Sequence, residues 1–249
     1  MKNKSVVVIP TYNERETLPT VVAELLDAGL DCLVVDDNSP DGTGDLADIW
    51  SDVLDPLGIG PAVYVLHRPE KQGLGRAYVA GFERALEMGF GLIGQMDADL
   101  SHPPGRMREL FAAVRLGQAD LAIGSRYIPG GTITSSWPKS RQILSKFGNL
   151  YARKILGLEP NDTTGAMRVW EPTLLADVLD DQPKSNGYCF LIEMLALAVV
   201  KHQAHWVEIP IHFAERAGGQ TKMDWRIQAE AALRVWQIRG QLGGKATNE

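Results

Sequence analysis

Two carboxylates stand one residue apart where an apolar segment of the chain ends. The run Leu92 to Met96 predicts a buried strand, and Asp97 and Asp99 come directly after it. A His-Pro-Pro breaker at residues 102–104 then stops the strand. Side chains alternate along a strand, so both carboxylates are expected to point to the same side if extended geometry continues that far. A divalent cation such as Mg²⁺ or Mn²⁺ would relieve their repulsion and bridge to phosphates of a substrate; the alternative is a solvated turn.

The composition is that of an ordinary globular protein, with 249 residues of which 45% are hydrophobic and 22% charged. Its 25 basic and 31 acidic residues give a formal net charge of −6, which does not favour nucleic acid as a partner. An anionic ligand must therefore be held by local groups. Cys32 and Cys189 lie far apart in apolar segments, which predicts two reduced, buried thiols in a cytoplasmic protein rather than a disulfide.

No segment is expected to act as a signal peptide or to span a membrane. The apolar run that ends at Pro10 is too short for a signal-peptide core. The run Phe190 to Val200 is interrupted by Glu193 and falls far below the roughly 20 residues that a span needs.

Strands and helices are expected to alternate through the first half of the chain. We predict strands at residues 6–9, 32–35, 62–66, 92–96 and 119–124, and helices at 13–28, 42–54, 75–88 and 106–116. This alternation predicts a parallel, doubly wound α/β sheet whose ligands bind outside the carboxyl ends of the strands. The polar clusters of the sequence fall at that edge.

Two amphipathic segments follow a long irregular loop at residues 129–138. Gln142 to Leu156 and Trp225 to Leu242 carry apolar residues at helical spacing, with Lys or Arg around them. The favoured interpretation is that both apolar stripes face the core. The alternative is a pair of helices on a membrane surface, which needs an apolar face flanked by basic residues.

Polar clusters also end the first two predicted strands. Residues 9–14 read IPTYNE and residues 35–43 read VDDNSPDGT. Acidic side chains beside a flat Tyr can hydrogen-bond the base and ribose of a nucleotide, although SPDG alone is ordinary turn chemistry. The Gly-x-Gly-x-x-Gly turn of dinucleotide dehydrogenases is missing, and KQGLGR at residues 71–76 lacks the Gly-Lys-Ser/Thr ending of a phosphate loop.

Together these segments resemble the family 2 glycosyltransferases of GT-A fold, and within them most closely the dolichol-phosphate or polyprenol-phosphate mannose synthases. The resemblance covers about residues 5 to 240, in order, and rests on VVVIPTYNE (6–14), VVDDNSPDGT (34–43), KQGLGRAY (71–78), DADLSHPP (97–104), GSRY (124–127), SRQILSKFGNLYAR (140–153), DTTGAMR (162–168), GYCFLIEML (187–195) and IPIHFAERAGGQTKM (209–223). It implies a single GT-A domain over residues 1–249, with a nucleotide-binding half at about 5–125 and an acceptor-binding half at about 126–242 that carries the amphipathic helices.

The resemblance implies transfer of mannose from GDP-mannose to a polyprenyl monophosphate, with inversion, to give a polyprenyl β-mannosyl phosphate. Mg²⁺ or Mn²⁺ on Asp99 and Asp97 would stabilise the charge that builds on the diphosphate. The implied setting is the cytoplasmic face of a membrane, bound peripherally, with or without a membrane-anchored partner subunit. Alternatives are another donor, such as UDP-glucose, and a nucleotide-binding module that has lost catalysis.

The resemblance also implies roles for single residues. Asp97, Asp99, Arg126 and Glu193 are the catalytic candidates, and the donor site comprises Pro10, Tyr12, Glu14, Val35, Asp37, Asp97, Ala98, Asp99, Arg216 and Lys222. Arg126, Arg141 and Lys146 are candidates for the acceptor phosphate, because the Arg fork suits phosphate oxygens. The acceptor is already an anion and needs no strong base, so Glu193 is expected to orient an Arg or a metal ligand.

Two positions depart from the family pattern. Ala166-Met167 replaces the usual aromatic of the DxTxGFR-like element. Ser101 stands where some members carry a Gln metal ligand, which makes it the third candidate ligand beside Asp97 and Asp99. His102, between Ser101 and Pro103, is expected to shape the turn rather than to act as a base.

Overall fold

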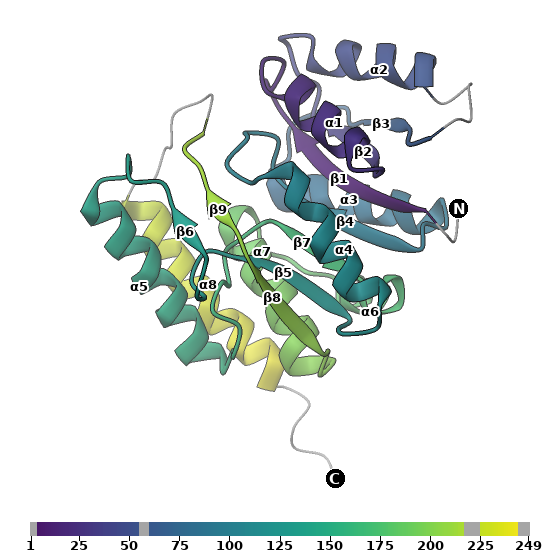
Figure 1. Cartoon of the computed structure of the whole chain (residues 1–249). Coiled ribbons are helices and arrows are strands. Elements are labelled where there is room, and N and C mark those ends of the chain that lie inside the picture. The colour runs from purple at the N-terminus through teal and green to yellow at the C-terminus, as the bar shows by residue number, and fades with distance from the viewer. Residues whose placement is uncertain (1–3, 55–59, 217–224, 244–249) are drawn as a thin grey trace.

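The structure is a computed structural model that describes residues 4–54, 60–216 and 225–243. Strands and helices alternate as predicted through the first half of the chain, and further elements follow (Figure 1). In chain order the elements are β1 (Ser5–Thr11), α1 (Leu18–Asp27), β2 (Asp31–Asp36), α2 (Thr43–Leu54), β3 (Val63–His67), α3 (Leu74–Glu87), β4 (Leu92–Gln95), the short helix η2 (Pro104–Arg106), α4 (Met107–Arg115), β5 (Leu121–Ser125), β6 (Thr132–Ile133), α5 (Lys139–Leu156), β7 (Arg168–Trp170), α6 (Pro172–Asp180), α7 (Gly187–Ala196), the π-helical turn η3 (Leu197–Lys201), β8 (Trp206–Pro210), β9 (His212–Phe213) and α8 (Trp225–Gly243).

The main sheet has seven strands in the order β3-β2-β1-β4-β7-β5-β8. Its pairs are parallel except that β7 runs antiparallel to both β4 and β5, so the predicted mostly parallel sheet is confirmed. The chain passes from β1 outward through β2 to β3 and then returns to place β4 on the other side of β1. In open α/β sheets, ligands bind at such a reversal of strand order, outside the carboxyl ends of the strands.

Both faces of the sheet are covered, because the central strands alternate between two cores. On β1, Val6 and Val8 pack toward α3 and α7, whereas Val7 and Ile9 pack toward α1 and α4. A strand buried on both faces reads as a continuous apolar run, which explains why periodicity alone predicted the central strands well. Cys32 and Cys189 are buried free thiols, as predicted.

The first predicted helix begins later than expected. Residue Asn13 has a left-handed backbone (φ 61°), and the helix starts at Leu18 after Thr17, with Pro19 in its first turn. The segment between Thr11 and Thr17 is therefore a turn at the carboxyl end of β1. Because of this shift Glu14 lies in the turn beside Tyr12, at the edge of the sheet, rather than inside a helix.

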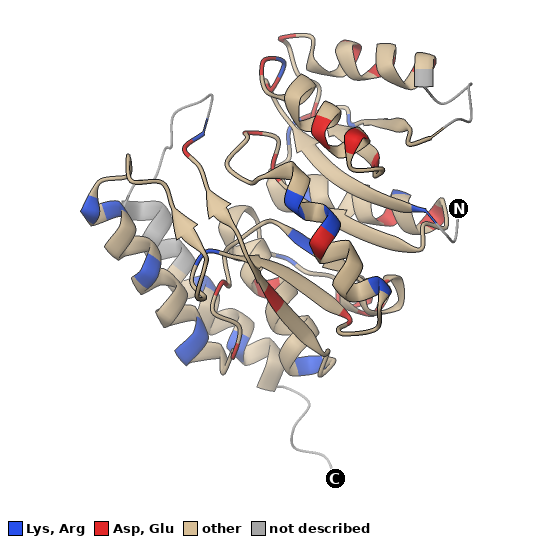
Figure 2. Ribbon diagram, viewed as in Figure 1, with Lys and Arg blue, Asp and Glu red and all other residues tan. Residues whose placement is uncertain are grey.

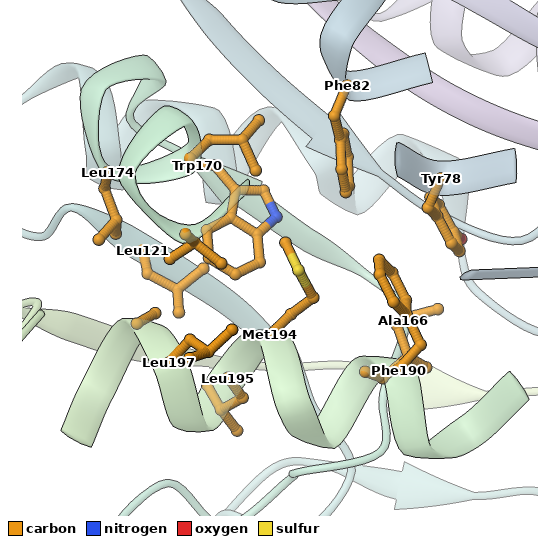
Figure 3. Close-up of a cluster of buried hydrophobic side chains, with 14 of the residues drawn as sticks. Tyr78, Phe82, Leu121, Ala166, Trp170, Leu174, Phe190, Met194, Leu195 and Leu197 are labelled. Atoms are coloured by element: carbon orange, nitrogen blue, oxygen red, sulfur yellow. The ribbon is translucent and has the colours of Figure 1, made fainter. Parts of the chain in front are cut away.

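Helix α7 joins the two halves of the chain through its buried residues. Phe190 lies beside Tyr78 of α3, and Met194 lies near Trp170 of β7 (Figure 3). The indole Nε1 of Trp170 donates a hydrogen bond to Gln95 Oε1 at 2.8 Å, which ties the antiparallel strand to β4. Strand β7 was not predicted, because three residues are too few to show a period.

Helices α5 and α8 lie side by side at the end of the molecule remote from β3 (Figure 1). The prediction that the stripe of residues 142–156 faces the core is wrong for the first half of α5. Ile143, Phe147 and Leu150 are 67%, 62% and 51% exposed, and the helix begins three residues earlier, at Lys139. Farther along α5, Ala152 and Leu156 are buried and Tyr151 and Ile155 are partly buried. Val235 and Ile238 of α8 are buried as well, whereas Leu233 and Trp236 are exposed. None of the helices in the described part of the chain is long and apolar enough to cross a membrane.

Gly81 lets helix α3 lie close to the sheet, because it has no side chain on the face that packs against β1 and β2. A Cβ at Gly81 would lie 2.8 Å from Val35 Cγ2 and closer still to Val8 Cγ1. We expect Gly81→Ala to lower the free energy of unfolding by about 1–3 kcal/mol, because overpacking outweighs the better helix propensity of Ala. Urea unfolding measures this.

The matched control is Gly148→Ala in α5, where an added Cβ has no atom within 4 Å. The same exchange should there raise the free energy of unfolding by up to about 1 kcal/mol. Equal effects at the two glycines would contradict the close approach of α3 to the sheet.

Candidate active site

The carboxyl ends of β1, β2 and β4 meet at one edge of the sheet. The amide of Asp37 donates to Thr11 O at 3.1 Å, and the amide of Met96 donates to Val8 O at 3.3 Å, so the three chain segments leave the sheet side by side. The polar cluster after each strand is thus brought to the same place, as the alternation of strands and helices predicted. Asp36 serves the loop itself, since its carboxylate accepts from Ser39 N at 3.0 Å and from Ser39 Oγ at 2.5 Å.

A turn, rather than strand geometry, places Asp97 and Asp99. Strand β4 ends at Gln95, and Leu100 takes a left-handed backbone (φ 61°). The chain also bends at residues 98–100, so extended geometry does not continue through the pair and the expectation based on strand alternation does not apply. Asp97 Oδ1 accepts a hydrogen bond from Tyr78 Oη at 2.9 Å. Asp99 Oδ1 accepts from the Ser101 amide at 3.0 Å.

Arg216 is the cation that faces the carboxylates. Its Nε lies 2.6 Å from Asp99 Oδ2, which brings the segment after β9 to the end of β4. Burial lowers the pKa of Arg216, but the charge of Asp99, followed by more distant acidic groups, raises it overall. Arg216, which was predicted to bind the donor diphosphate, thus lies against the carboxylate pair. Lys222, predicted for the same role, lies outside the described residues.

Acidic charge accumulates at this edge. Burial raises the pKa of Asp97, and the neighbouring charge of Asp99 raises it further, against the opposing effects of His102, Tyr78 and Arg216. Burial also raises the pKa of Glu14, with Asp99 and Asp97 adding to it, although the Thr17 hydroxyl opposes the shift. Carboxylates gathered in this way favour binding of a cation, because its charge offsets their repulsion.

Several oxygen donors fit a hard divalent ion. The described residues contain no cluster of three or more His, Cys, Asp or Glu side chains placed to hold a metal. Ser101 Oγ is buried and has no hydrogen-bond partner among the described residues. Asp97, Asp99 and this hydroxyl would form a partial set of oxygen ligands, which suits Mg²⁺ or Mn²⁺ because these ions keep positions for phosphate oxygens and water.

Basic and aromatic residues lie on the side of β2 and β3. Arg68, just after β3, forms an ion pair with Asp37, and Lys71 Nζ lies 3.7 Å from the centre of the Tyr12 ring. Glu14 Oε2 accepts from Thr17 Oγ1 at 2.8 Å. Pro10, Val35 and Ala98 are buried. Sequence reasoning missed Arg68, although its place directly after a predicted strand was the available signal.

Arg126 is held by an acidic residue that sequence reasoning did not select. Its Nε and Nη2 donate to the two oxygens of Asp162 at 2.7 and 2.6 Å, and Nη2 also reaches Thr164 Oγ1 at 2.8 Å. The bidentate fork that was expected to face an acceptor phosphate is thus engaged inside the protein. Despite its burial, Asp162 has a pKa held below its usual value by the Arg126 guanidinium.

Phe213 connects the Arg residues to the acidic cluster. Its ring centre lies 4.9 Å from Arg126 Cζ, 5.0 Å from the His102 ring and 5.7 Å from the Trp137 ring. Arg141, in the first turn of α5, stacks on the far side of this chain of rings, with its Cζ 3.7 Å from the Trp137 ring centre. His102 is buried, and both of its ring nitrogens lack a hydrogen-bond partner among the described residues.

The remaining two candidates lie elsewhere on the second half of the chain. Lys146 is exposed on α5. Glu193 is buried in α7, where its Oε2 accepts from the Ser185 amide at 2.7 Å and its Oε1 lies 3.5 Å from Arg234 Nη2 of α8. Glu193 therefore pairs with an Arg of the C-terminal helix rather than with a group of the carboxylate cluster.

The sequence model of glycosyl transferase family 2 matches residues 6–178, which include the carboxylate pair, the residues around Tyr12 and Asp37, and the Arg126–Asp162 pair. The chain belongs to glycosyl transferase family 2. It is therefore a glycosyltransferase. Enzymes of this family with a GT-A fold generally use a divalent metal ion, in agreement with the oxygen donors at Asp97 and Asp99.

Relatives support the assignment along the whole chain. The polyprenol monophosphomannose synthase of Mycolicibacterium smegmatis is 44% identical over 96% of this chain and 89% of its own length. The undecaprenyl-phosphate mannosyltransferase of Micrococcus luteus is 44% identical over 95% of each chain. Among solved structures, S. aureus TarS 1-349 in complex with UDP-GlcNAc covers 96% of this chain and 71% of its own, with a TM-score of 0.60 and 15% identity. That likeness confirms the GT-A fold.

The Arg126–Asp162 pair generates a prediction on stability. Asp162→Asn should lower the free energy of unfolding at neutral pH by about 3 kcal/mol, because it leaves a buried guanidinium without its counter-charge. Since the native pKa of Asp162 lies below its unfolded value, the carboxylate stabilises the fold above about pH 4, and this effect is lost as the pH falls through the native pKa. The difference between wild type and variant should stay constant from about pH 8 to 5 and shrink below about pH 4.

Urea unfolding across this pH range measures the effect. The control is Asp48→Asn, which breaks the half-exposed pair with His67 and should change stability by no more than about 1 kcal/mol. A similar, small effect at Asp162 would show that the buried pair does not organise this part of the site.

Proposed function

We propose that this glycosyltransferase moves mannose from GDP-mannose to the phosphate of a polyprenyl lipid, giving polyprenyl β-mannosyl phosphate. The observation that carries the proposal is the carboxylate pair Asp97 and Asp99, faced by Arg216 at the switch point of a doubly wound sheet. The two relatives, one a polyprenol monophosphomannose synthase and the other an undecaprenyl-phosphate mannosyltransferase, support mannose and a polyprenyl phosphate as substrates.

The donor would bind along the edge from β2 to β4. Tyr12, Glu14 and Asp37 would surround the base, with a carboxylate accepting from the N–H groups of guanine. Asp97, Asp99 and the Ser101 hydroxyl would hold Mg²⁺ or Mn²⁺, which when bound neutralises charge on the leaving diphosphate. Arg216, with Lys222, would turn from the carboxylates toward the diphosphate, since its guanidinium already lies at this point.

The acceptor would approach from the side of α5. Its phosphate is already an anion, so an oxygen of that group can attack the anomeric carbon as the bond to the diphosphate breaks, and no side chain has to remove a proton. Arg141 and Lys146 of α5 would bind the acceptor phosphate. Arg126 would contribute through Nη1, the nitrogen that makes no hydrogen bond within the described part of the chain.

The lipid tail of the acceptor requires a membrane, and the outer surface of α5 suits one. Ile143, Phe147 and Leu150 form an exposed apolar stripe, beside which Leu233 and Trp236 of α8 are also exposed. Basic residues run along the same helix (Figure 2), where Lys139, Lys146 and Lys154 are exposed. An apolar face flanked by Lys binds the surface of an anionic membrane. We place this surface on the cytoplasmic leaflet, from which Arg141 at the start of α5 can reach the phosphate.

The transfer itself is tested with a donor panel. Wild type with Mn²⁺, a polyprenyl phosphate and radiolabelled GDP-mannose should give a lipid-extractable product that mild acid cleaves. Asp99→Ala should lower the rate by at least about 100-fold, because it removes charge stabilisation at the diphosphate. Transfer from UDP-glucose but not from GDP-mannose would show that the proposed donor is wrong. Binding of a sugar nucleotide without transfer to any acceptor would indicate an inactive nucleotide-binding module.

Membrane binding is tested by flotation with vesicles that contain anionic lipid. Exchange of Phe147 and Leu150 together for Gln should weaken binding at least about tenfold, because two apolar side chains no longer enter the interface. The control exchanges Ile49 and Val53 of α2 for Gln, since both are 58% exposed on another helix. Equal loss in the two double variants would mean that α5 is not the docking surface.

A further inference from the structure

Tyr78 contacts Asp97 of the carboxylate pair from the core side, and it has no role in the transfer proposed above. It lies on α3, its side chain is fully buried, and its Oη donates to Asp97 Oδ1 at 2.9 Å. A buried hydroxyl needs a partner, and a carboxylate needs donors to stay ionised in a buried place. The hydrogen bond from Tyr78 to Asp97 meets both requirements.

The Tyr78 ring is held in place on both sides. It stacks on Phe82 with centroids 5.7 Å apart and on Phe190 with centroids 6.0 Å apart, and the planes of Tyr78 and Phe190 differ by only 6° (Figure 3). Gly75 brings α3 close to α7, since a Cβ there would lie 2.8 Å from Ser185 O and 3.0 Å from the Phe190 ring. The hydroxyl is therefore a rigid donor, and it fixes the orientation of the carboxylate that it contacts.

Asp97 and Asp99 are thus held in different ways. The contact with Tyr78 engages Oδ1 of Asp97, and Oδ2 takes no part in that hydrogen bond. Asp99 is held by the Ser101 amide and by Arg216, whose long side chain can move away. Asp97, whose carboxylate is held by Tyr78, is therefore the more rigid of the two candidate metal ligands.

We propose that Tyr78 is a positioning residue for the divalent cation, acting by holding the Asp97 carboxylate in the orientation that binds it. The inference rests on the proposed function in one respect, namely that a cation binds at Asp97 and Asp99. Groups that orient the ligands of a metal typically account for 10–100-fold in metal affinity or activity. If Tyr78 had only a structural role, its ring would suffice without the hydroxyl, because the ring is what packs against Phe82 and Phe190.

Tyr78→Phe separates these roles, because it keeps the stacked ring and removes only the hydroxyl. In the presence of GDP, Mn²⁺ is titrated into the protein and the free ion is followed by electron paramagnetic resonance. We expect the variant to bind Mn²⁺ at least about tenfold more weakly than wild type.

The matched control is Tyr151→Phe, which removes a hydroxyl that donates to Ala232 O at 3.1 Å, between α5 and α8. Its Mn²⁺ affinity should equal that of wild type. If Tyr78→Phe does not fold, Phe190→Leu takes its place, because it frees the Tyr78 ring on one side while keeping the hydroxyl; it too should weaken Mn²⁺ binding.

Wild-type Mn²⁺ affinity in Tyr78→Phe, or in Phe190→Leu where that variant is used, would overturn the role of Tyr78 and leave the proposed transfer intact. Failure of wild type itself to bind Mn²⁺ with GDP would overturn both the role of Tyr78 and the metal site on which the transfer depends. A loss of Mn²⁺ affinity as large in Tyr151→Phe as in Tyr78→Phe would also overturn the role.

Discussion

Repulsion among acidic side chains at one edge of the sheet is the constraint on which the site depends. Asp97 and Asp99 leave the same turn, and burial together with their mutual charge makes ionisation of Asp97 harder. The protein offsets this with Arg216 on Asp99 and with the Tyr78 hydroxyl on Asp97. Each of these contacts engages only one of the two carboxylates. A cation that binds together with a diphosphate can therefore neutralise the remaining negative charge.

The two halves of the chain contribute different charges to this balance. Parallel strands β1, β2 and β4 bring acidic groups to their common carboxyl edge, because each strand ends in a polar loop. The second half brings guanidinium groups, and the aromatic residues Trp137 and Phe213 link Arg141 and Arg126 to His102 beside the carboxylates. The acidic groups of the first half and the guanidinium groups of the second are therefore distant in sequence but connected through one set of aromatic rings.

Sequence patterns predicted the parts of the fold that local composition determines. The strands of the first half are apolar on both faces, and the polar residues that follow them reach one edge in any doubly wound sheet. Strand β7 escaped because three residues show no period, and the pairs of Asp162, Arg68 and Tyr78 escaped because each partner is distant in sequence. Phe147 shows a further limit: helical periodicity indicates an apolar stripe, but not whether protein or lipid covers it.

The central claim is that Asp97 is placed for a cation at a cost to the metal-free fold. The most direct test is thermal unfolding of wild type and Asp97→Asn, each in EDTA and each with Mn²⁺ and GDP. In EDTA the variant should unfold at the higher temperature, because one repelling charge is gone and the amide oxygen still accepts from Tyr78. With Mn²⁺ and GDP only wild type should gain stability. A variant less stable than wild type in EDTA, or one that keeps the gain from Mn²⁺ and GDP, would contradict this account.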